Sequence, residues 1–260
     1  IVELLHINKR KIQIGISEFQ WHYPSMVWIA GADGCKAGWF RVSLETQSRD
    51  LQYLCAKNVR DLFQYKPHPS LLGLDIPIGL PEKGNRKCDL GARALLHTNR
   101  KSSVFPAPIR AALNARTYEE ACGITKQKSG KKISKQTFFL FPKIKEVDQF
   151  LQQKKGYRKD IIEVHPEVSF WKWAGRTMEF SKKKKSGKEE RLHLISKQFG
   201  SEALERARAA LNKEKFRKKD VADDDILDAY AALWTAERCF QGIADVVPEH
   251  GEEDPTSLPM

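Results

Sequence analysis

Long apolar runs are absent from this sequence of 260 residues: no stretch approaches the ~18 to 20 apolar residues that a membrane-spanning helix needs. We therefore expect no contact with a membrane. Cysteine is scarce too. The five cysteines are scattered and form no CxxC pair, which argues against a disulfide framework or a structural zinc site and favours the reducing cytoplasm. A Walker-type phosphate loop is also missing, which disfavours an ATPase.

Acidic residues are the minority among the charged side chains. The chain has 33 Asp and Glu against 45 Lys and Arg, which gives a formal net charge of +12 and a pI of about 9.4. Hydrophobic residues make up 41% of the chain, enough for a real core, so wholesale disorder is not expected. A basic chain whose acids stand out at a few positions suits an enzyme that acts on a phosphodiester, and it predicts a nucleic-acid partner, RNA or DNA.

The two ends of the chain differ from the rest. The segment 1–25 lacks the apolar core and cleavage site of a signal peptide, and Met26 immediately precedes the first convincing strand. We expect residues 1–25 to be a non-native or flexible extension; the alternative is a genuine extension with its own strand around 12–16. Residues 26–246 are expected to form one domain, and the acidic, Pro-containing stretch 247–260 a flexible tail.

The first part of the domain predicts a mixed sheet of the α/β class. Alternating and apolar runs indicate strands at 27–33, 39–44, 51–55 and 71–75, and a short helix at 58–65 precedes the fourth. Two tight hairpins make the first three strands antiparallel. A helix then crosses over to the apolar fourth strand, which makes the sheet mixed.

The second part predicts one more strand and several helices. An irregular, basic stretch at 77–130 follows the fourth strand as an insertion of helices and loops, and loops of this length in a compact domain are usually functional. A fifth strand is expected at 160–165, ended by Pro166. The expected helices are 136–153, 189–199, 201–212 and 223–240.

Carboxylates occur where these buried elements begin or end, or interrupt them. They are Asp33 and Asp75 at strand ends, Glu163 inside the fifth strand, and Asp224, Asp225 and Asp228 in the first turns of the last helix. A carboxylate at such a position is costly to desolvate unless a positive charge pairs with it. Oxygen ligands from several elements are what Mg²⁺ prefers, so we expect these groups to converge within roughly 8 Å around two metal ions.

Each carboxylate also has an ordinary structural explanation. Asp33 before Gly34 can be a turn residue, and Glu163 can face solvent if its strand lies at a sheet edge. Acids in the first turn of a helix are favoured as caps, which covers Asp224 and Asp225 better than Asp228, a full turn further on. Asp33, Asp75, Glu163 and the acids of the last helix are harder to explain in this way together than each one alone.

Several other residues are candidates for contacts with substrate. If 87–96 is helical, Arg86 and Arg93 share a face and can clamp a phosphate, or they form a salt-bridged face with Asp89. Ser103 lies in the same insertion. His165 can activate water or be a packed, hydrogen-bonded histidine.

Lysine runs and tryptophans give a second group of candidates. The run Lys182, Lys183, Lys184 and Lys185 suits contacts with backbone phosphates, as does the basic stretch 213–219, although solvated charge is the common explanation for such runs. Trp171 and Trp173 can stack on bases, with core packing as the default.

Several short segments carry a resemblance to a known family. They are Ala30–Trp39, Leu74–Pro81, Arg86–Asp89 with Ala92–Arg93, Ser103–Phe105, Glu163–Glu167 and Asp224–Ala229. In this order they resemble a family of uncharacterised proteins described as predicted ribonuclease H-like nucleases. The resemblance implies a ribonuclease H-like fold whose acidic centre is formed by Asp33, Asp75, Glu163 and the last helix, with Asp228 or Asp225 as the helix-borne acid.

Two functions remain open at this point. The first is a Mg²⁺- or Mn²⁺-dependent nuclease, in which Asp33 bridges two ions, Asp75 and Glu163 flank them, and Asp228 with Asp225 or Asp224 completes the site. The second is a catalytically silent protein that binds nucleic acid or a nucleotide on the same scaffold. Loss of Mn²⁺ binding when Asp33 is changed to Asn would distinguish the nuclease from the silent binder.

Overall fold

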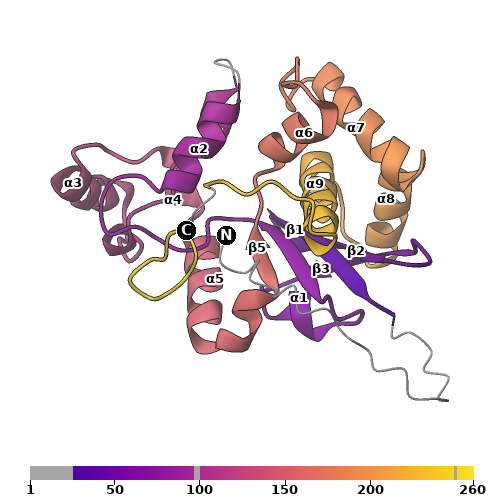
Figure 1. Ribbon diagram of the computed structural model, residues 1–260, viewed down its shortest axis with the longest axis horizontal. Coiled ribbons are helices and arrows are strands. Elements are labelled where there is room, and N and C mark those ends of the chain that lie inside the picture. The colour runs from indigo at the N-terminus through magenta and orange to yellow at the C-terminus, as the bar shows by residue number, and fades with distance from the viewer. Residues whose placement is uncertain (1–25, 97–99, 249–250) are drawn as a thin grey trace.

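A computed structural model describes residues 26–96, 100–248 and 251–260, and its centre is an open, mixed sheet of five strands (Figure 1). The strands are β1 (Trp28–Cys35), β2 (Gly38–Glu45), β3 (Leu51–Ala56), β4 (Leu71–Asp75) and β5 (Ile161–Glu163). Their order in the sheet is β3-β2-β1-β4-β5. Strand β2 is antiparallel to both of its neighbours, β1 and β3, and β4 and β5 run parallel to β1. The predicted α/β class and the antiparallel start of the sheet are confirmed.

Helices flank this sheet and fill the insertion between β4 and β5. In chain order they are α1 (Asp61–Gln64), α2 (Lys87–Leu95), η2 (Lys101–Ser103), η3 (Arg110–Ala112), α3 (Tyr118–Ser129), α4 (Lys135–Phe139), α5 (Phe141–Gln153), η4 (Lys155–Lys159), α6 (Pro166–Ala174), α7 (Lys185–Phe199), α8 (Ala203–Lys213) and α9 (Asp223–Phe240). None of these helices combines the length and the apolar character that crossing a membrane requires.

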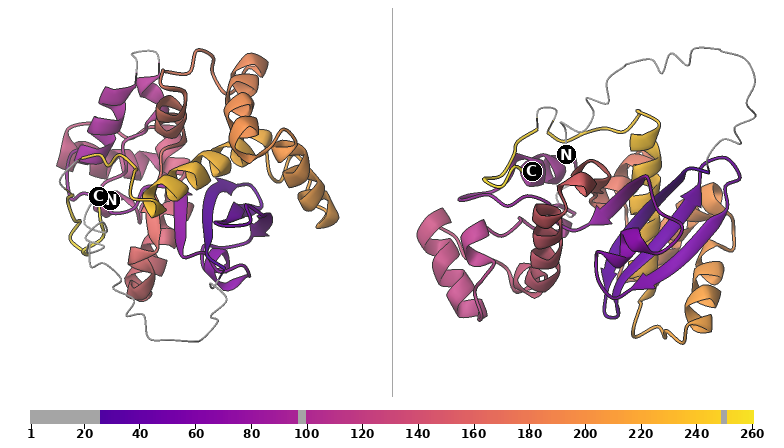
Figure 2. Two further views of the ribbon diagram at one scale, coloured as in Figure 1. Left: turned by 45° about the vertical axis from the view of Figure 1, so that its right-hand side comes forward. Right: turned by 90° about the horizontal axis from the view of Figure 1, so that it is seen from below.

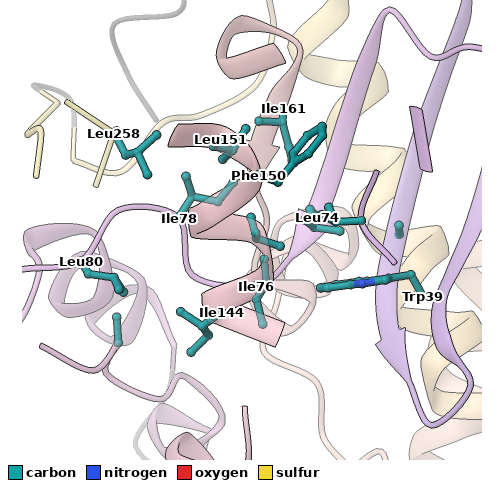
Figure 3. Close-up of a cluster of buried hydrophobic side chains, with 14 of the residues drawn as sticks. Trp39, Leu74, Ile76, Ile78, Leu80, Ile144, Phe150, Leu151, Ile161 and Leu258 are labelled. Atoms are coloured by element: carbon teal, nitrogen blue, oxygen red, sulfur yellow. The ribbon is translucent and has the colours of Figure 1, made fainter. Parts of the chain in front are cut away.

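The sheet separates two apolar layers, because side chains alternate between its faces along each strand. One layer joins Leu72 and Leu74 of β4 to α1 and α5, where Ile144 and Phe150 are buried (Figure 3). The other layer joins the opposite face of β1 and β2 to α7, α8 and α9. Figure 2 shows α9, drawn in yellow, running along the strands. The sequence of β4 is a nearly continuous apolar run because this central strand is covered on both faces.

The insertion is more helical than its irregular sequence indicates. Helix α3 was not expected, although Thr117 accepts a hydrogen bond from the amide of Glu120 at its start and Gly130, with a positive φ, ends it. The single helix expected at 136–153 is two helices, which meet at Leu140. Pro142 lacks an N–H group and therefore occupies the first turn of α5, where no intrahelical donor is needed.

The region after β5 also differs from the expectation. The strand is shorter than the predicted 160–165, and Pro166 is the first residue of helix α6, which was not predicted. The proline has its ring fixed at a helical φ and needs no hydrogen-bond partner in the first turn. The charged run at 181–191 enters helix α7 at Lys185, four residues before the predicted start.

The last residues of the chain pack against the domain. Leu258 is buried in the layer that holds α5, and the carboxylate of Asp254 accepts hydrogen bonds from the amides of Leu80 and Leu258 and pairs with Arg110. These contacts differ from the flexible tail expected for 247–260, because a buried leucine and a bound carboxylate anchor the segment. The predicted extension 1–25, with its possible strand at 12–16, lies outside the described residues.

Candidate functional site

Asp33 and Asp75 lie side by side at the ends of two neighbouring parallel strands. They are direct register partners between β1 and β4. The amide of Gly34 donates to the Asp33 carboxylate over 2.6 Å, so part of the turn function weighed for Asp33 is present as well. The carboxyl ends of parallel strands are where open sheets commonly place their ligands.

Two glycines bring helix α9 onto the sheet beside these aspartates. Gly31 and Gly73 are also register partners, two residues before Asp33 and Asp75, and therefore face the same side. A Cβ atom at Gly31 would lie closer than 3.0 Å to the backbone of Ala229 and Leu233, and one at Gly73 would lie 2.5 Å from the carbonyl oxygen of Ala232. Only glycine permits this approach, so the helix backbone rests directly on β1 and β4.

Helix α9 thereby adds a third carboxylate. Asp228 lies one turn before Ala232, toward the strand ends, and its side chain is 3% exposed. Asp33, Asp75 and Asp228 each offer an oxygen atom within 4.8 Å of the other two. The predicted convergence of an acid from β1, an acid from β4 and one from the last helix is therefore present in the structure.

The electrostatics of this group (here the aspartate triad) are unfavourable without a cation. Burial and the neighbouring carboxylates of Asp75 and Asp228 hold the pKa of Asp33 well above its usual range. Burial, together with Asp228, raises the pKa of Asp75 to about 8. One positive group compensates in part: the ammonium group of Lys182 donates to Asp228, and this carboxylate raises the pKa of Lys182. When all three carboxylates are ionised, the one ammonium leaves two negative charges unbalanced.

Glu163 does not join the triad with its oxygens. Both of them accept hydrogen bonds from the guanidinium of Arg86 over 2.7 Å, and one also accepts from the amide of Ile78 over 2.7 Å. Arg86 is 1% exposed and also bonds to Asp89. Glu163 therefore neutralises a buried arginine and anchors the loop after β4, whereas the sequence predicts a metal ligand at this position.

The arginines expected to clamp a phosphate have structural partners instead. Arg86 lies between Glu163 and Asp89 and also donates to the carbonyl of Ile78 over 2.9 Å. Cys88, Asp89 and Glu163 also bring potential ligand atoms within 4.8 Å of one another, but the Arg86 guanidinium pairs with both carboxylates and compensates one of their two charges. Arg93 donates to the carbonyl of Val104 over 2.7 Å. The salt-bridge alternative describes Arg86 and Asp89 correctly.

The acids at the start of α9 have separate roles. Asp223 pairs with Arg208 and Lys218, and Asp225 accepts a hydrogen bond from the amide of Ala222 over 2.7 Å, as a capping residue does. Burial raises the pKa of Asp225 to about 6. Asp224 is partly buried in the same turn. Of the candidate acids on this helix, only Asp228 belongs to the triad.

A hollow of about 200 Å³ lies over the triad, and its wall contains several further polar side chains. The predicted residues Glu163, Ser103, His165 and Lys182 line it. Burial lowers the pKa of His165, so its imidazole is neutral at pH 7. Lys183, Lys184 and Lys185 are exposed outside the hollow, as the solvated-charge alternative describes.

Three charged residues of this hollow were missed from the sequence. Lys143 of α5 donates to the carbonyl of Gly38 and lies 4.5 Å from the centre of the Trp39 ring. Arg100 donates to the carbonyl of Met178 over 3.1 Å, and Glu167 in the first turn of α6 lies 3.6 Å from Arg100. No local pattern marks Lys143 or Arg100, whereas Glu167 belongs to the segment that carries the family resemblance.

The two candidate tryptophans differ in their surroundings. Trp173 stacks on Trp234 with ring centres 4.9 Å apart and also packs on Phe170, as the core-packing alternative expects. Trp171 lines a separate, larger cavity next to β5. The basic stretch 213–219 contributes no residue to the hollow over the triad.

Comparison with known proteins adds a family but no activity. A family model described as "Protein of unknown function (DUF429)" matches residues 31–253, which include the triad, Glu163 and Lys182. Neither the curated proteins nor the solved structures contain a match to the chain.

Proposed function

We propose that this chain, which belongs to the DUF429 family of proteins of unknown function, is a metal-dependent nuclease with a ribonuclease H-like fold. The observation that carries the proposal is the aspartate triad, Asp33, Asp75 and Asp228, which three different elements bring together at the carboxyl ends of parallel strands. The strand order β3-β2-β1-β4-β5, with an antiparallel start, supports the ribonuclease H-like assignment that the family resemblance implies.

The residues of the triad suit Mg²⁺ or Mn²⁺. All three are carboxylates, the ligand type that these hard cations prefer. The ionised triad with Lys182 carries two unbalanced negative charges, which match one divalent ion. A bound ion would stabilise the negative charge that develops on the phosphodiester oxygens and lower the pKa of water. The sequence predicts two ions. With Glu163 engaged by Arg86, a second ion would depend on oxygen atoms of the substrate.

The remaining residues of the hollow can position the substrate. Lys182 and Lys143 line the hollow, and their ammonium groups can attract phosphate oxygens there. The neutral imidazole of His165 can accept a proton there. A strongly basic chain further favours a polyanion over a small neutral substrate.

A second candidate is the catalytically silent nucleic-acid- or nucleotide-binding protein. One observation favours it: Lys182 already supplies a positive charge to Asp228, so part of the need for a metal ion is met by the protein itself. On this alternative, the triad and Lys182 form a structural ion network and the basic surface alone binds the polyanion.

A cleavage assay distinguishes the two candidates. Labelled RNA, single-stranded DNA and duplex DNA are incubated with the full chain in Mn²⁺ or Mg²⁺, and the products are compared for the wild type, Asp75→Asn and Asp50→Asn. Asp50 is a matched control because it is exposed in the turn between β2 and β3, at the opposite end of the sheet. The nuclease predicts cleavage that Asp75→Asn abolishes and Asp50→Asn retains. Binding of a nucleic acid without cleavage of any of these substrates would support the catalytically silent binding protein.

A further inference from the structure

A cavity of about 590 Å³ lies beside β5, separate from the hollow over the triad. It is enclosed by β5, α2, α6, the end of α9 and the segment that follows α9. Its wall is mostly apolar and includes Ile162, Val168, Trp171, Trp234, Cys239 and Val247. A concave, mostly apolar cavity of this size is typical of a binding site for an organic ligand.

The cavity and the hollow share one wall. Glu163, Val164 and His165 line both of them. The two spaces therefore lie next to each other, on either side of this segment. This proximity relates the cavity to the chemistry of the triad.

The side chains of the cavity suit a flat heterocycle. Trp171 and the neutral imidazole of His165 lie in the wall and have π faces, on which nucleobases can stack. The hydroxyl groups of Ser169 and Thr235 lie in the wall, 2.7 Å apart, and a hydroxyl group can form more than one hydrogen bond. Strand β5 is at the edge of the sheet, and an edge strand has backbone N–H and C=O groups without sheet partners. A purely hydrocarbon ligand would use none of these polar groups.

We propose that this cavity receives a nucleobase of the strand whose phosphate lies at the aspartate triad, an inference that rests on the proposed function. A base stacked inside a duplex cannot enter a side cavity, because it must first leave the stack at a cost of a few kcal/mol. The substrate is therefore single-stranded nucleic acid, or a duplex at a position where a base is unpaired.

Binding of free nucleosides tests the cavity apart from the triad. Adenosine, guanosine, cytidine and uridine carry no phosphate and are titrated into the metal-free full chain, with calorimetry and tryptophan fluorescence as readouts. We expect at least one nucleoside to bind the wild type. Ala92→Trp, which fills the cavity from α2, should weaken this binding at least tenfold, and Leu90→Trp should leave it unchanged because Leu90 is 51% exposed on the same helix.

A second variant fills the cavity from another helix, so that the test does not depend on the folding of Ala92→Trp alone. Cys239→Trp enters the same cavity from α9, and circular dichroism melting compares each variant with the wild type. The inference is overturned if no nucleoside binds at millimolar concentration, if both folded filling variants bind as the wild type does, or if a fatty acid binds in the cavity in place of nucleosides. Nucleoside binding without any cleavage would refute the nuclease and keep the base site. Cleavage without nucleoside binding would refute the base site and keep the nuclease.

Discussion

At the scale of single residues, Lys182 has the most informative position. Its ammonium pairs with Asp228, while the next three lysines of the same run point to solvent. A cation on the triad would be repelled by this ammonium and attracted by the carboxylates. Lys182 therefore tunes the charge of the triad, in addition to the phosphate contact proposed for it, and the other three lysines of the run do not share this position.

Replacement of this lysine should strengthen metal binding. Two unit charges about 4 Å apart interact by roughly 1 to 4 kcal/mol at effective dielectric constants between those of water and a protein surface. In Lys182→Gln we expect Mn²⁺ to bind about tenfold more tightly than in the wild type, since a tenfold change corresponds to about 1.4 kcal/mol. Calorimetry measures this, with Lys185→Gln as the control because the Lys185 side chain is 91% exposed. Weaker Mn²⁺ binding in Lys182→Gln would contradict the charge argument.

The raised pKa of Asp75 predicts how stability depends on pH. In the unfolded chain an aspartate titrates near pH 4, whereas the pKa of folded Asp75 is about 8. Between these values the folded state binds more protons, so its stability falls as the pH rises from about 4 to 8. Asp75→Asn cannot ionise and should raise the melting temperature of the metal-free protein at pH 8, with a smaller gain at pH 5. Equal shifts at both pH values would contradict the raised pKa.

A variant of Glu163 distinguishes a role in a buried ion pair from a role as a metal ligand. Glu163→Gln removes the charge that compensates Arg86 on one side, and breaking a buried ion pair costs about 3 to 5 kcal/mol. We expect a loss of this order in urea unfolding and less than a threefold change in Mn²⁺ affinity. Glu189→Gln is the control, since its side chain is 62% exposed. A stable variant that no longer binds Mn²⁺ would restore Glu163 as a ligand.

At the scale of elements, the close packing of α9 on β1 and β4 forms the triad. Gly31→Ala places a methyl group against the helix backbone and should destabilise the fold by roughly 1 to 3 kcal/mol or more, as overpacking does. Gly123→Ala in α3 is the control: no atom lies within 4 Å of its added methyl group, and alanine favours a helix by up to ~1 kcal/mol. Thermal unfolding compares the two. Unchanged stability in Gly31→Ala would show that the helix can move away at little cost.

The sequence predicts the acids of the triad but not the contacts between distant elements. Strand ends and helix starts are local patterns, so Asp33, Asp75 and Asp228 could be predicted as a converging group. The partner of Glu163 could not, because Arg86 lies 77 residues earlier in the chain and meets it only after the insertion has folded. Lys143 and Arg100 reach the hollow for the same reason. Helix α3 has a weak apolar stripe, so periodicity missed it although both of its caps are present in the sequence.

At the scale of the whole molecule, the fold places two kinds of surface side by side. The hollow over the triad is charged, and the cavity beyond β5 is mostly apolar with aromatic rings. The packing of the final segment against Leu80 and Arg110 also depends on long-range contacts, so composition alone predicted a flexible tail there. A basic chain with these two adjoining sites suits a ligand that is anionic at one end and aromatic at the other.

The central claim is that the aspartate triad binds a divalent metal ion, and a Mn²⁺ titration of the full chain tests it most directly. Calorimetry of the wild type should show at least one bound Mn²⁺. Affinity should collapse in Asp33→Asn, which removes one of the carboxylates that converge within 4.8 Å, and remain in Asp50→Asn. Equal Mn²⁺ binding by the wild type and Asp33→Asn, or no binding by the wild type, would contradict the account.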